Sequence, residues 1–227
     1  MPACTTLGEN TGVFQKTMTL TDEQKSFFRN EFSDFWSFIQ ATDFERESLF
    51  HELEIQARRV GVYSVGPWFG RLLNFLTRFG GVRSALEFGT ATGYSAIWIA
   101  RGLPPGGKLI TIERDAELSM LALENVAKAD LQEKVEIRTG EARDIASALS
   151  GPFDLIFVDC AHFEALEFSR RSMRSGGLFI CDNVGFHNKE GFNQALVTSP
   201  HLETLYLQCY LKGRIPENTA FSASIRK

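Results

Sequence analysis

The sequence predicts an α/β fold in which a mainly parallel sheet is covered by helices on both faces. From residue 84 onward, short apolar runs alternate with stretches of helical pattern, as βαβ units require. A glycine turn at residues 89–93 separates the first run from a helix, which is typical of a nucleotide-binding crossover. Polar residues directly follow several runs, at the sheet edge where such folds bind ligands. The predicted class is therefore doubly wound α/β.

The amino-terminal region is predicted to be mostly helical. Residues 1 to about 18 are rich in Thr and Gly and should form a loosely attached arm. A capping sequence starts at Thr21, and large apolar side chains then recur at helical spacing. They are Phe27, Phe28, Phe32, Phe35, Trp36 and Ile39. Packing on the chain's own domain is the favoured interpretation of this stripe, and a dimer contact or a substrate lid is the alternative.

Two further helices are predicted before the sheet begins. The first covers residues 44–60 and ends at Gly61, a residue type that is common just past helix ends. After an irregular run, the second covers residues 68–79 and ends at Gly80. We therefore expect residues 1–60 to form an arm and helices packed on the domain, and residues 61–227 to form the domain itself.

Seven strands and five helices are predicted in the rest of the chain. The strands are 84–88, 109–112, 135–138, 155–159, 178–181, 202–207 and 221–225. The helices are 94–101, 116–128, 142–149, 163–173 and 189–197. Because strands and helices alternate along most of this length, the strands should run mainly parallel.

Composition and charge exclude several classes of protein. A formal net charge of -4 argues against a general nucleic-acid binder, which would show a basic excess. The start of the chain has no secretory pattern, and no apolar run is long enough to span a bilayer. The four cysteines are scattered without a C-x-x-C pair, which predicts reduced thiols in a cytoplasm. The sequence thus favours a cytoplasmic protein with a small-molecule substrate and no nucleic-acid or membrane partner.

Acidic residues lie at the ends of several predicted strands. Glu87 precedes Gly89 of the glycine turn, and Glu113, Glu141 and Asp159 come at or just after later strands. Because parallel strands share one carboxyl edge, these acids should converge. Glu113 falls about twenty residues after the turn, the usual offset for an acid that binds a ribose diol. Glu141 would suit the exocyclic amine of adenine, although an acid favoured by a helix N-terminus explains it nearly as well.

The spacing of the glycine turn limits the ligand. The turn reads Gly-x-x-x-Gly rather than Gly-x-Gly-x-x-Gly, and no Gly-Lys-Ser/Thr follows it. This excludes a P-loop and disfavours tight packing against a pyrophosphate. A nucleoside without phosphates fits the turn better, and a dehydrogenase that binds a nicotinamide dinucleotide is the weaker alternative.

Three residues with hard oxygen atoms follow two of the predicted strands: Asp159, Asp182 and Asn183. Three oxygen ligands, with room for water and a bidentate substrate, describe an octahedral site for Mg²⁺ or a similar cation. Asp182 and Asn183 are adjacent, so both can be ligands only where the chain turns sharply. An Asx turn that closes the strand is the alternative explanation for this pair.

Four motifs occur in order along the chain: LEFGTATGYS at 86–95, PPGGKLITIE at 104–113, FDLIFVD at 153–159 and GGLFICDNV at 176–184. From about Gly61 onward the sequence resembles the cation-dependent small-molecule O-methyltransferases, the family of catechol and caffeoyl-CoA O-methyltransferases. The resemblance implies a seven-stranded methyltransferase fold, S-adenosylmethionine as cofactor, a divalent cation, with Mg²⁺ as the expected ion, and a homodimer. The amino-terminal helices carry none of the motifs.

The same resemblance implies roles for individual residues. Five would line the methionine end of the cofactor: Ser64, Val65, Glu87, Gly89 and Ser95. Glu113 would hold the ribose, and Glu141 with Ala142 would hold the adenine. Three match the family's metal ligands: Asp159, Asp182 and Asn183. The first of these three is also expected to contact the cofactor.

One position departs from the family's pattern. The family usually has Asp-x-x-Lys, with the lysine regarded as general base, whereas this chain has Asp-Cys-Ala-His at 159–162. An unperturbed histidine has a pKa of about 6.5, nearer to neutrality than the roughly 10.4 of lysine, so His162 is the candidate base. A solvated loop histidine without a catalytic part is the alternative. His187, in the loop after Asn183, is a weaker candidate.

The sequence therefore predicts a metal-dependent O-methyltransferase that acts on a small aromatic hydroxyl of the catechol or hydroxycinnamoyl type. The first alternative is a metal-independent N- or O-methyltransferase that uses His162 as base. The second is the nicotinamide-dinucleotide-dependent dehydrogenase. The methyl acceptor is expected to be a small molecule, which the sequence does not identify.

Overall fold

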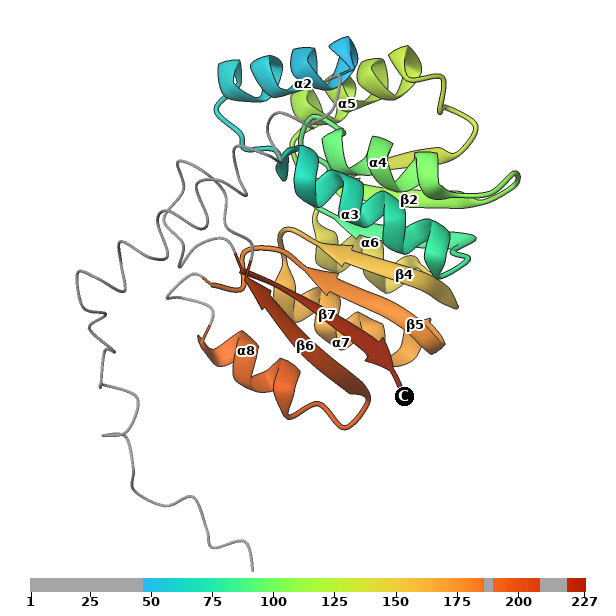
Figure 1. The fold of residues 1–227 in the computed structure, drawn as a ribbon, viewed down its shortest axis with the longest axis vertical. Coiled ribbons are helices and arrows are strands. Elements are labelled where there is room, and N and C mark those ends of the chain that lie inside the picture. Colours follow the sequence, from blue (N-terminus) through green and yellow to red (C-terminus); the bar gives the residue numbers. More distant parts are fainter. Residues whose placement is uncertain (1–46, 186–189, 209–219) are drawn as a thin grey trace, which may run out of the picture. The chain divides into compact units, whose positions relative to one another are not determined.

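The computed structural model describes residues 47–185, 190–208 and 220–227 (Figure 1). Within these ranges, the part of the chain from Glu47 to Lys227 forms one compact unit. The predicted arm, the aromatic stripe and His187 lie outside the described residues. Among the helices in the described ranges, none is both long enough and apolar enough to cross a membrane.

Seven strands form one sheet in the order β3-β2-β1-β4-β5-β7-β6. Their bounds are β1 Ser84–Phe88, β2 Lys108–Glu113, β3 Val135–Thr139, β4 Phe153–Val158, β5 Met173–Cys181, β6 Leu202–Gln208 and β7 Ala220–Arg226. β1 to β5 pair in parallel, and β7 is antiparallel to both of its neighbours. The predicted fold class is confirmed. The largest difference in strand bounds is in β5, whose polar start, with a register shift against β4, carries no apolar run to predict it.

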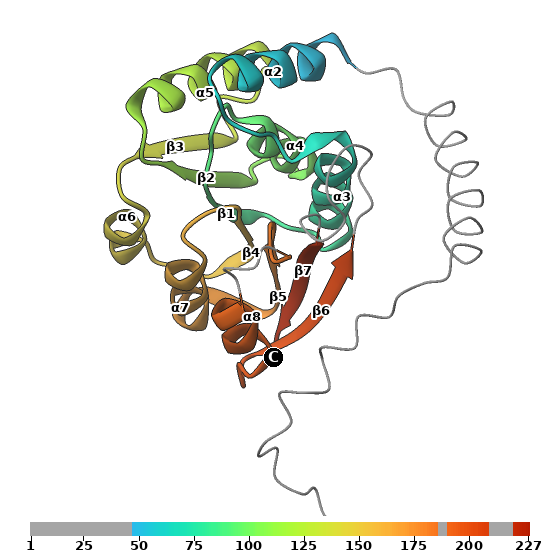
Figure 2. The ribbon, with the colours of Figure 1, turned by 90° about the vertical axis from the view of Figure 1, so that its left-hand side faces the viewer.

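Seven helices flank the sheet in the described residues. Their bounds are α2 Ser48–Arg59, α3 Gly66–Phe79, α4 Tyr94–Gly102, α5 Ala116–Lys128, α6 Ala142–Ala148, α7 His162–Ser172 and α8 Glu190–Val197. Helices α2 to α5 contribute to one apolar cluster and α6 to α8 to another, so the two groups cover opposite faces of the sheet (Figure 2). This arrangement confirms a doubly wound fold.

Side chains of the central strands alternate between the two clusters. Ala85 and Leu155 belong to the cluster under α2 to α5, whereas Leu86 and Ile156 belong to the cluster under α6 to α8. By the same alternation, Glu87 faces the α2 to α5 side. The central strand therefore places a carboxyl group in an otherwise apolar row, next to the glycine turn.

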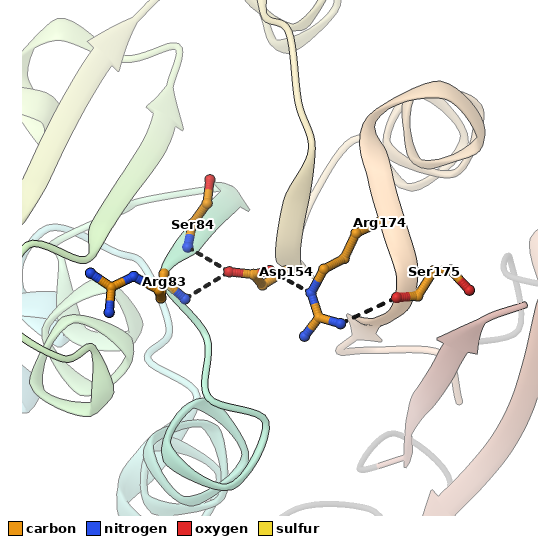
Figure 3. A network of polar contacts seen from close by, with 5 residues as sticks. All are labelled: Arg83, Ser84, Asp154, Arg174 and Ser175. Atoms are coloured by element: carbon orange, nitrogen blue, oxygen red, sulfur yellow. Dashed lines mark hydrogen bonds and ion pairs between the residues drawn. The ribbon is translucent and has the colours of Figure 1, made fainter.

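Asp154, near the start of β4, fixes the sheet edge opposite the strand carboxyl ends (Figure 3). Its Oδ2 accepts hydrogen bonds from the backbone amides of Arg83, at 2.7 Å, and Ser84, at 2.9 Å, and its Oδ1 pairs with Arg174 Nε. Burial alone would raise the pKa of Asp154, but these hydrogen bonds outweigh it, and the pKa is lowered. The carboxylate thus joins the starts of three neighbouring strands, away from the candidate site.

Candidate active site

The loops after β1 and β4 meet at the topological switch point of the sheet, where folds of this class bind ligands. The backbone amides of Asp159 and Cys160 donate to the Phe88 carbonyl at 2.9 and 3.2 Å. Gly89 has a φ of 99°, and a Cβ there would lie 3.1 Å from Cys160 Sγ. A side chain at this position would be strained and crowded, so glycine allows the two loops to approach each other.

Glu113, the last residue of β2, holds the glycine turn in place. Its Oε2 accepts a hydrogen bond from the Ala91 amide at 2.8 Å, and its Oε1 accepts one from the Asp115 amide at 3.0 Å. The amide of Gly140 donates to the Glu113 carbonyl at 2.8 Å, which brings the loop after β3 to the same place. The predicted ribose acid therefore stands where the loops of β1, β2 and β3 meet.

The residues predicted to hold the adenine and the methionine end are spread around this centre. Glu141 is exposed at the N-cap of α6, directly after Gly140, and Ala142 begins that helix. Ser64 is half-buried in the loop that enters α3, and Val65 is buried in the cluster on the same face as Glu87. Glu141 therefore lies next to Gly140, whose amide is hydrogen-bonded to the Glu113 carbonyl.

Glu87 is completely enclosed. Its Oε2 accepts a hydrogen bond from Thr111 Oγ1 at 2.6 Å, and its side chain has no exposed surface. Burial raises the pKa of Glu87 to about 8, with the carboxylates of Asp159 and Glu113 acting in the same direction and the hydroxyls of Ser95 and Thr111 acting against it. The carboxyl group of Glu87 therefore lies inside the protein, next to the glycine turn, and is not exposed to solvent.

The charged groups around the Cys160 thiol indicate the electrostatic character of the site. Burial of its thiol raises the pKa of Cys160 to about 12, with the carboxylates of Asp159, Glu113 and Glu87 acting in the same direction and Arg114 acting against them. Carboxyl groups from the ends of three neighbouring strands therefore influence the same thiol. Such a site favours a positively charged ligand and disfavours a pyrophosphate.

Asp159, Asp182 and Asn183 come together as the sequence predicts. The backbone of Asn183 is left-handed, with a φ of 61°, which provides the sharp turn that two adjacent ligands need. Asn183 Nδ2 donates to Asp159 Oδ1 at 2.6 Å, and the Asn183 amide donates to Asp182 Oδ1 at 2.8 Å. In the described part of the chain, no group of three or more His, Cys, Asp or Glu side chains is placed to hold a metal ion. A cation here would therefore depend on the amide oxygen of Asn183, brought round by rotation of its amide group.

His162 begins α7 and is 5% exposed, so the solvated-loop alternative is wrong. Its Nε2 lies 2.9 Å from the Asp182 carbonyl, and because a carbonyl oxygen only accepts, this nitrogen donates. Its ring meets the ring of buried Phe192 of α8 edge to face, with centroids 5.1 Å apart. A general base at this position would have to use Nδ1. The contact of Nε2 with the Asp182 carbonyl favours a supporting role for the ring, and the base role stays a prediction that the pH–rate profile tests.

Three polar residues that the sequence did not single out support the turn. Thr90 and Thr111 are both buried and share a hydrogen bond of 2.6 Å. Asn125 Nδ2 donates to the Thr92 carbonyl at 2.9 Å and to Gln56 Oε1 at 2.6 Å, which ties α5 and α2 to the turn. The available signal was a polar residue inside an apolar pattern, at Thr111 in the run of β2 and at Asn125 on the buried face of α5.

The fold and these strand-end residues define the architecture of a Rossmann-like methyltransferase. An O-methyltransferase from Bacillus cereus, solved in complex with SAH, superimposes with a TM-score of 0.76 at 27% identity, covering 84% of this chain and 96% of that one. An O-methyltransferase assigned in Klebsiella pneumoniae superimposes with a TM-score of 0.75 at 27% identity, covering 84% and 94%.

The sequence profile of the O-methyltransferase family matches residues 43–197. The chain therefore belongs to the O-methyltransferase family. A catechol O-methyltransferase of Niastella koreensis is 41% identical over 128 residues, which are 53% of this chain and 58% of that protein. One from Mycobacterium tuberculosis is 34% identical over 119 residues, 51% of this chain and 54% of that protein. The chain thus spans a little over half the length of these two relatives.

Proposed function

We propose that the chain is an S-adenosylmethionine-dependent O-methyltransferase of small aromatic hydroxyls, assembled as a homodimer. The observation that carries this proposal is the convergence of Glu87, Glu113 and Asp159 around the glycine turn. S-adenosylmethionine carries a sulfonium and an ammonium group, so this negative site attracts it. The same charges repel the pyrophosphate of a nicotinamide dinucleotide, which counts against the dehydrogenase alternative.

Different residues around the turn would bind different parts of the cofactor. Glu113 would accept hydrogen bonds from the ribose hydroxyls, because its carboxylate already stands among the loops of three strands. Ser64, Val65, Gly89 and Ser95 would line the methionine end. Glu141 and Ala142 would lie at the adenine. The relative from Bacillus cereus, solved with SAH and covered over 96% of its length, supports S-adenosylmethionine as the cofactor that these residues would bind.

A divalent cation, Mg²⁺ by preference, would be held by Asp159, Asp182 and Asn183. Two carboxylates and an amide follow the neighbouring strands β4 and β5, where Asn183 is hydrogen-bonded to both Asp159 and Asp182, and together they form a donor set of hard oxygen atoms that fits such an ion. A bound cation lowers the pKa of an acceptor hydroxyl and orients a vicinal pair of oxygens. The two relatives named as catechol O-methyltransferases support an acceptor with such a pair.

The chain's own contribution to the reaction would be mostly positional. Asp159 belongs to the loop that contacts Gly89 and also touches Asn183, so it links the cofactor side of the site to the cation side. An acceptor held at Asp182 and Asn183 would therefore lie next to the methionine end of the cofactor. Holding the two reactants in line supplies a large part of the rate in such transfers.

Binding and turnover assays on the full chain test this function. Isothermal titration should detect binding of S-adenosylhomocysteine and not of NAD. A screen of catechols, hydroxycinnamoyl esters and flavonoids should give a methylated product with Mg²⁺ and none in excess chelator. Binding of NAD alone would favour the dehydrogenase, and full activity in chelator would favour the metal-independent methyltransferase.

His162→Ala is expected to lower turnover about tenfold at every pH, without changing the shape of the pH–rate profile. The reason is that Nε2 donates to the carbonyl of Asp182, so the ring supports the loop that would hold the cation. A change of one hydrogen bond of roughly 1.4 kcal/mol corresponds to about this factor. The profile should be recorded for wild type, His162→Ala and His162→Lys. Loss of the acidic limb in His162→Ala, with its return at higher pH in His162→Lys, would assign the base role to this position.

A further inference from the structure

A chain of hydroxyl groups connects the glycine turn to Glu87 inside the protein. Thr90 Oγ1 lies 2.6 Å from Thr111 Oγ1, and Thr111 Oγ1 donates to Glu87 Oε2 at 2.6 Å. Each of the three residues is at most 1% exposed. Thr111 of β2 is the register partner of Glu87 in β1, whereas Thr90 belongs to the turn itself. These hydroxyl groups therefore connect the turn to β1 by way of β2.

The direction of the hydrogen bonds in this chain follows from proton counting. A threonine hydroxyl has one proton, and that of Thr111 is donated to Glu87, so the oxygen of Thr111 accepts from Thr90. The backbone of Thr90 is fixed as well, since its amide donates to the Ile112 carbonyl at 3.2 Å and its carbonyl accepts from the Gly93 amide at 2.8 Å. Thr90 thus has one permitted arrangement while Glu87 is ionised.

The other carboxyl oxygen of Glu87, Oε1, accepts no hydrogen bond from these threonine hydroxyls. Oε1 is buried and has no partner in hydrogen-bonding geometry among the residues that the structure describes. Ser95, in the first turn of α4, is the second hydroxyl that acts on this carboxyl group. Because the pKa of Glu87 is raised to about 8, the protonated form is favoured near pH 7 when no cation is near, and a bound cation would favour the ionised form.

We propose that Thr111 and Thr90 are positioning residues, which hold Glu87 as the counter-charge for the ammonium group of the cofactor. The inference rests on the proposed function, because the ammonium belongs to the methionine end of S-adenosylmethionine. Thr111 fixes one edge of the carboxylate, so the charge stays directed at the segment that carries Ser95. The hydrogen bond from Thr111 favours the ionised form of Glu87, so loss of the hydroxyl lets the carboxyl group turn and weakens its attraction for the ammonium.

The test compares two ligands on three proteins. S-adenosylhomocysteine carries the ammonium, whereas adenosine has the same nucleoside without it. Thr111→Val removes the hydroxyl at nearly constant shape, and Thr111→Ser keeps it. We expect the Kd of S-adenosylhomocysteine to rise at least about tenfold in Thr111→Val and to stay near the wild-type value in Thr111→Ser. The Kd of adenosine should change in neither variant.

Thr77→Val is the matched control. Thr77 is as buried as Thr111, but its hydroxyl donates within α3, to the Leu73 carbonyl at 2.7 Å, so the ratio of the two Kd values should not move. Thermal unfolding is followed for every variant, and Thr90→Val with Thr90→Ser tests the same chain from the turn if Thr111→Val does not fold. Equal weakening of both ligands, or no weakening, overturns the inference. Failure of the wild type to bind S-adenosylhomocysteine overturns the proposed function instead.

Discussion

Asp159→Ala is expected to lower the rate of cation-dependent methyl transfer to a catechol-type acceptor by about a thousandfold. Asp159 supplies one of the two carboxylates proposed for the cation and one of the three around the glycine turn. A catalytic metal ion contributes several kcal/mol, and a loss of roughly 4 kcal/mol corresponds to this factor. The fold should persist, since the backbone amide of residue 159 still donates to the Phe88 carbonyl. The measurement is kcat/KM at saturating Mg²⁺.

Asp154→Ala is the control for this variant, because Asp154 lies at the start of β4 and Asp159 directly after its end, so the two carboxylates are at opposite edges of the sheet. Asp154 joins strand starts through the amides of Arg83 and Ser84, so its loss should lower the unfolding temperature. Below that temperature, the response of turnover to Mg²⁺ and to chelator should match that of the wild type. Retention of Mg²⁺-dependent turnover in Asp159→Ala would exclude the proposed ligand set.

The sequence predicted the parts of the fold that depend on local patterns. The bounds of β1 and α5 agree with the prediction because an apolar run and the glycine turn mark the first and a helical pattern marks the second. The convergence of strand-end residues also followed, since a parallel sheet has a single carboxyl edge. The start of β5, with its exposed polar residues, had no such signal.

Contacts that depend on strand register and helix packing could not be predicted from local sequence patterns. Thr111 is the partner of Glu87 only because β1 and β2 pair in one particular register. Asn125 reaches the Thr92 carbonyl only because α5 packs beside the turn. The argument for His162 as a base rested on residue type, whereas the folded chain encloses the ring between α8 and the Asp182 carbonyl. Burial and partners, rather than residue type, set the behaviour of such groups.

Glu113→Ala is expected to weaken binding of S-adenosylhomocysteine at least about a hundredfold. The carboxylate would lose its contacts with the ribose, and the turn would lose the tie between Glu113 Oε2 and the Ala91 amide. Hydrogen bonds to charged groups contribute about 1.5–3 kcal/mol each, so two of them account for a factor of this size. The Kd is measured by isothermal titration on the full chain.

Glu113→Gln and Glu117→Ala separate the causes of that loss. Glutamine keeps one acceptor oxygen and no charge, so its Kd should fall between those of wild type and Glu113→Ala. Glu117 is exposed on the first turn of α5, and its removal changes the net charge equally without touching the ties to the turn, so the Kd should stay near the wild-type value. Equal weakening in Glu117→Ala would mean that long-range charge alone attracts the cofactor. A Kd in Glu113→Ala within twofold of wild type would remove this residue from the ribose site, because a buried acid that bound the diol could not be lost at so small a cost.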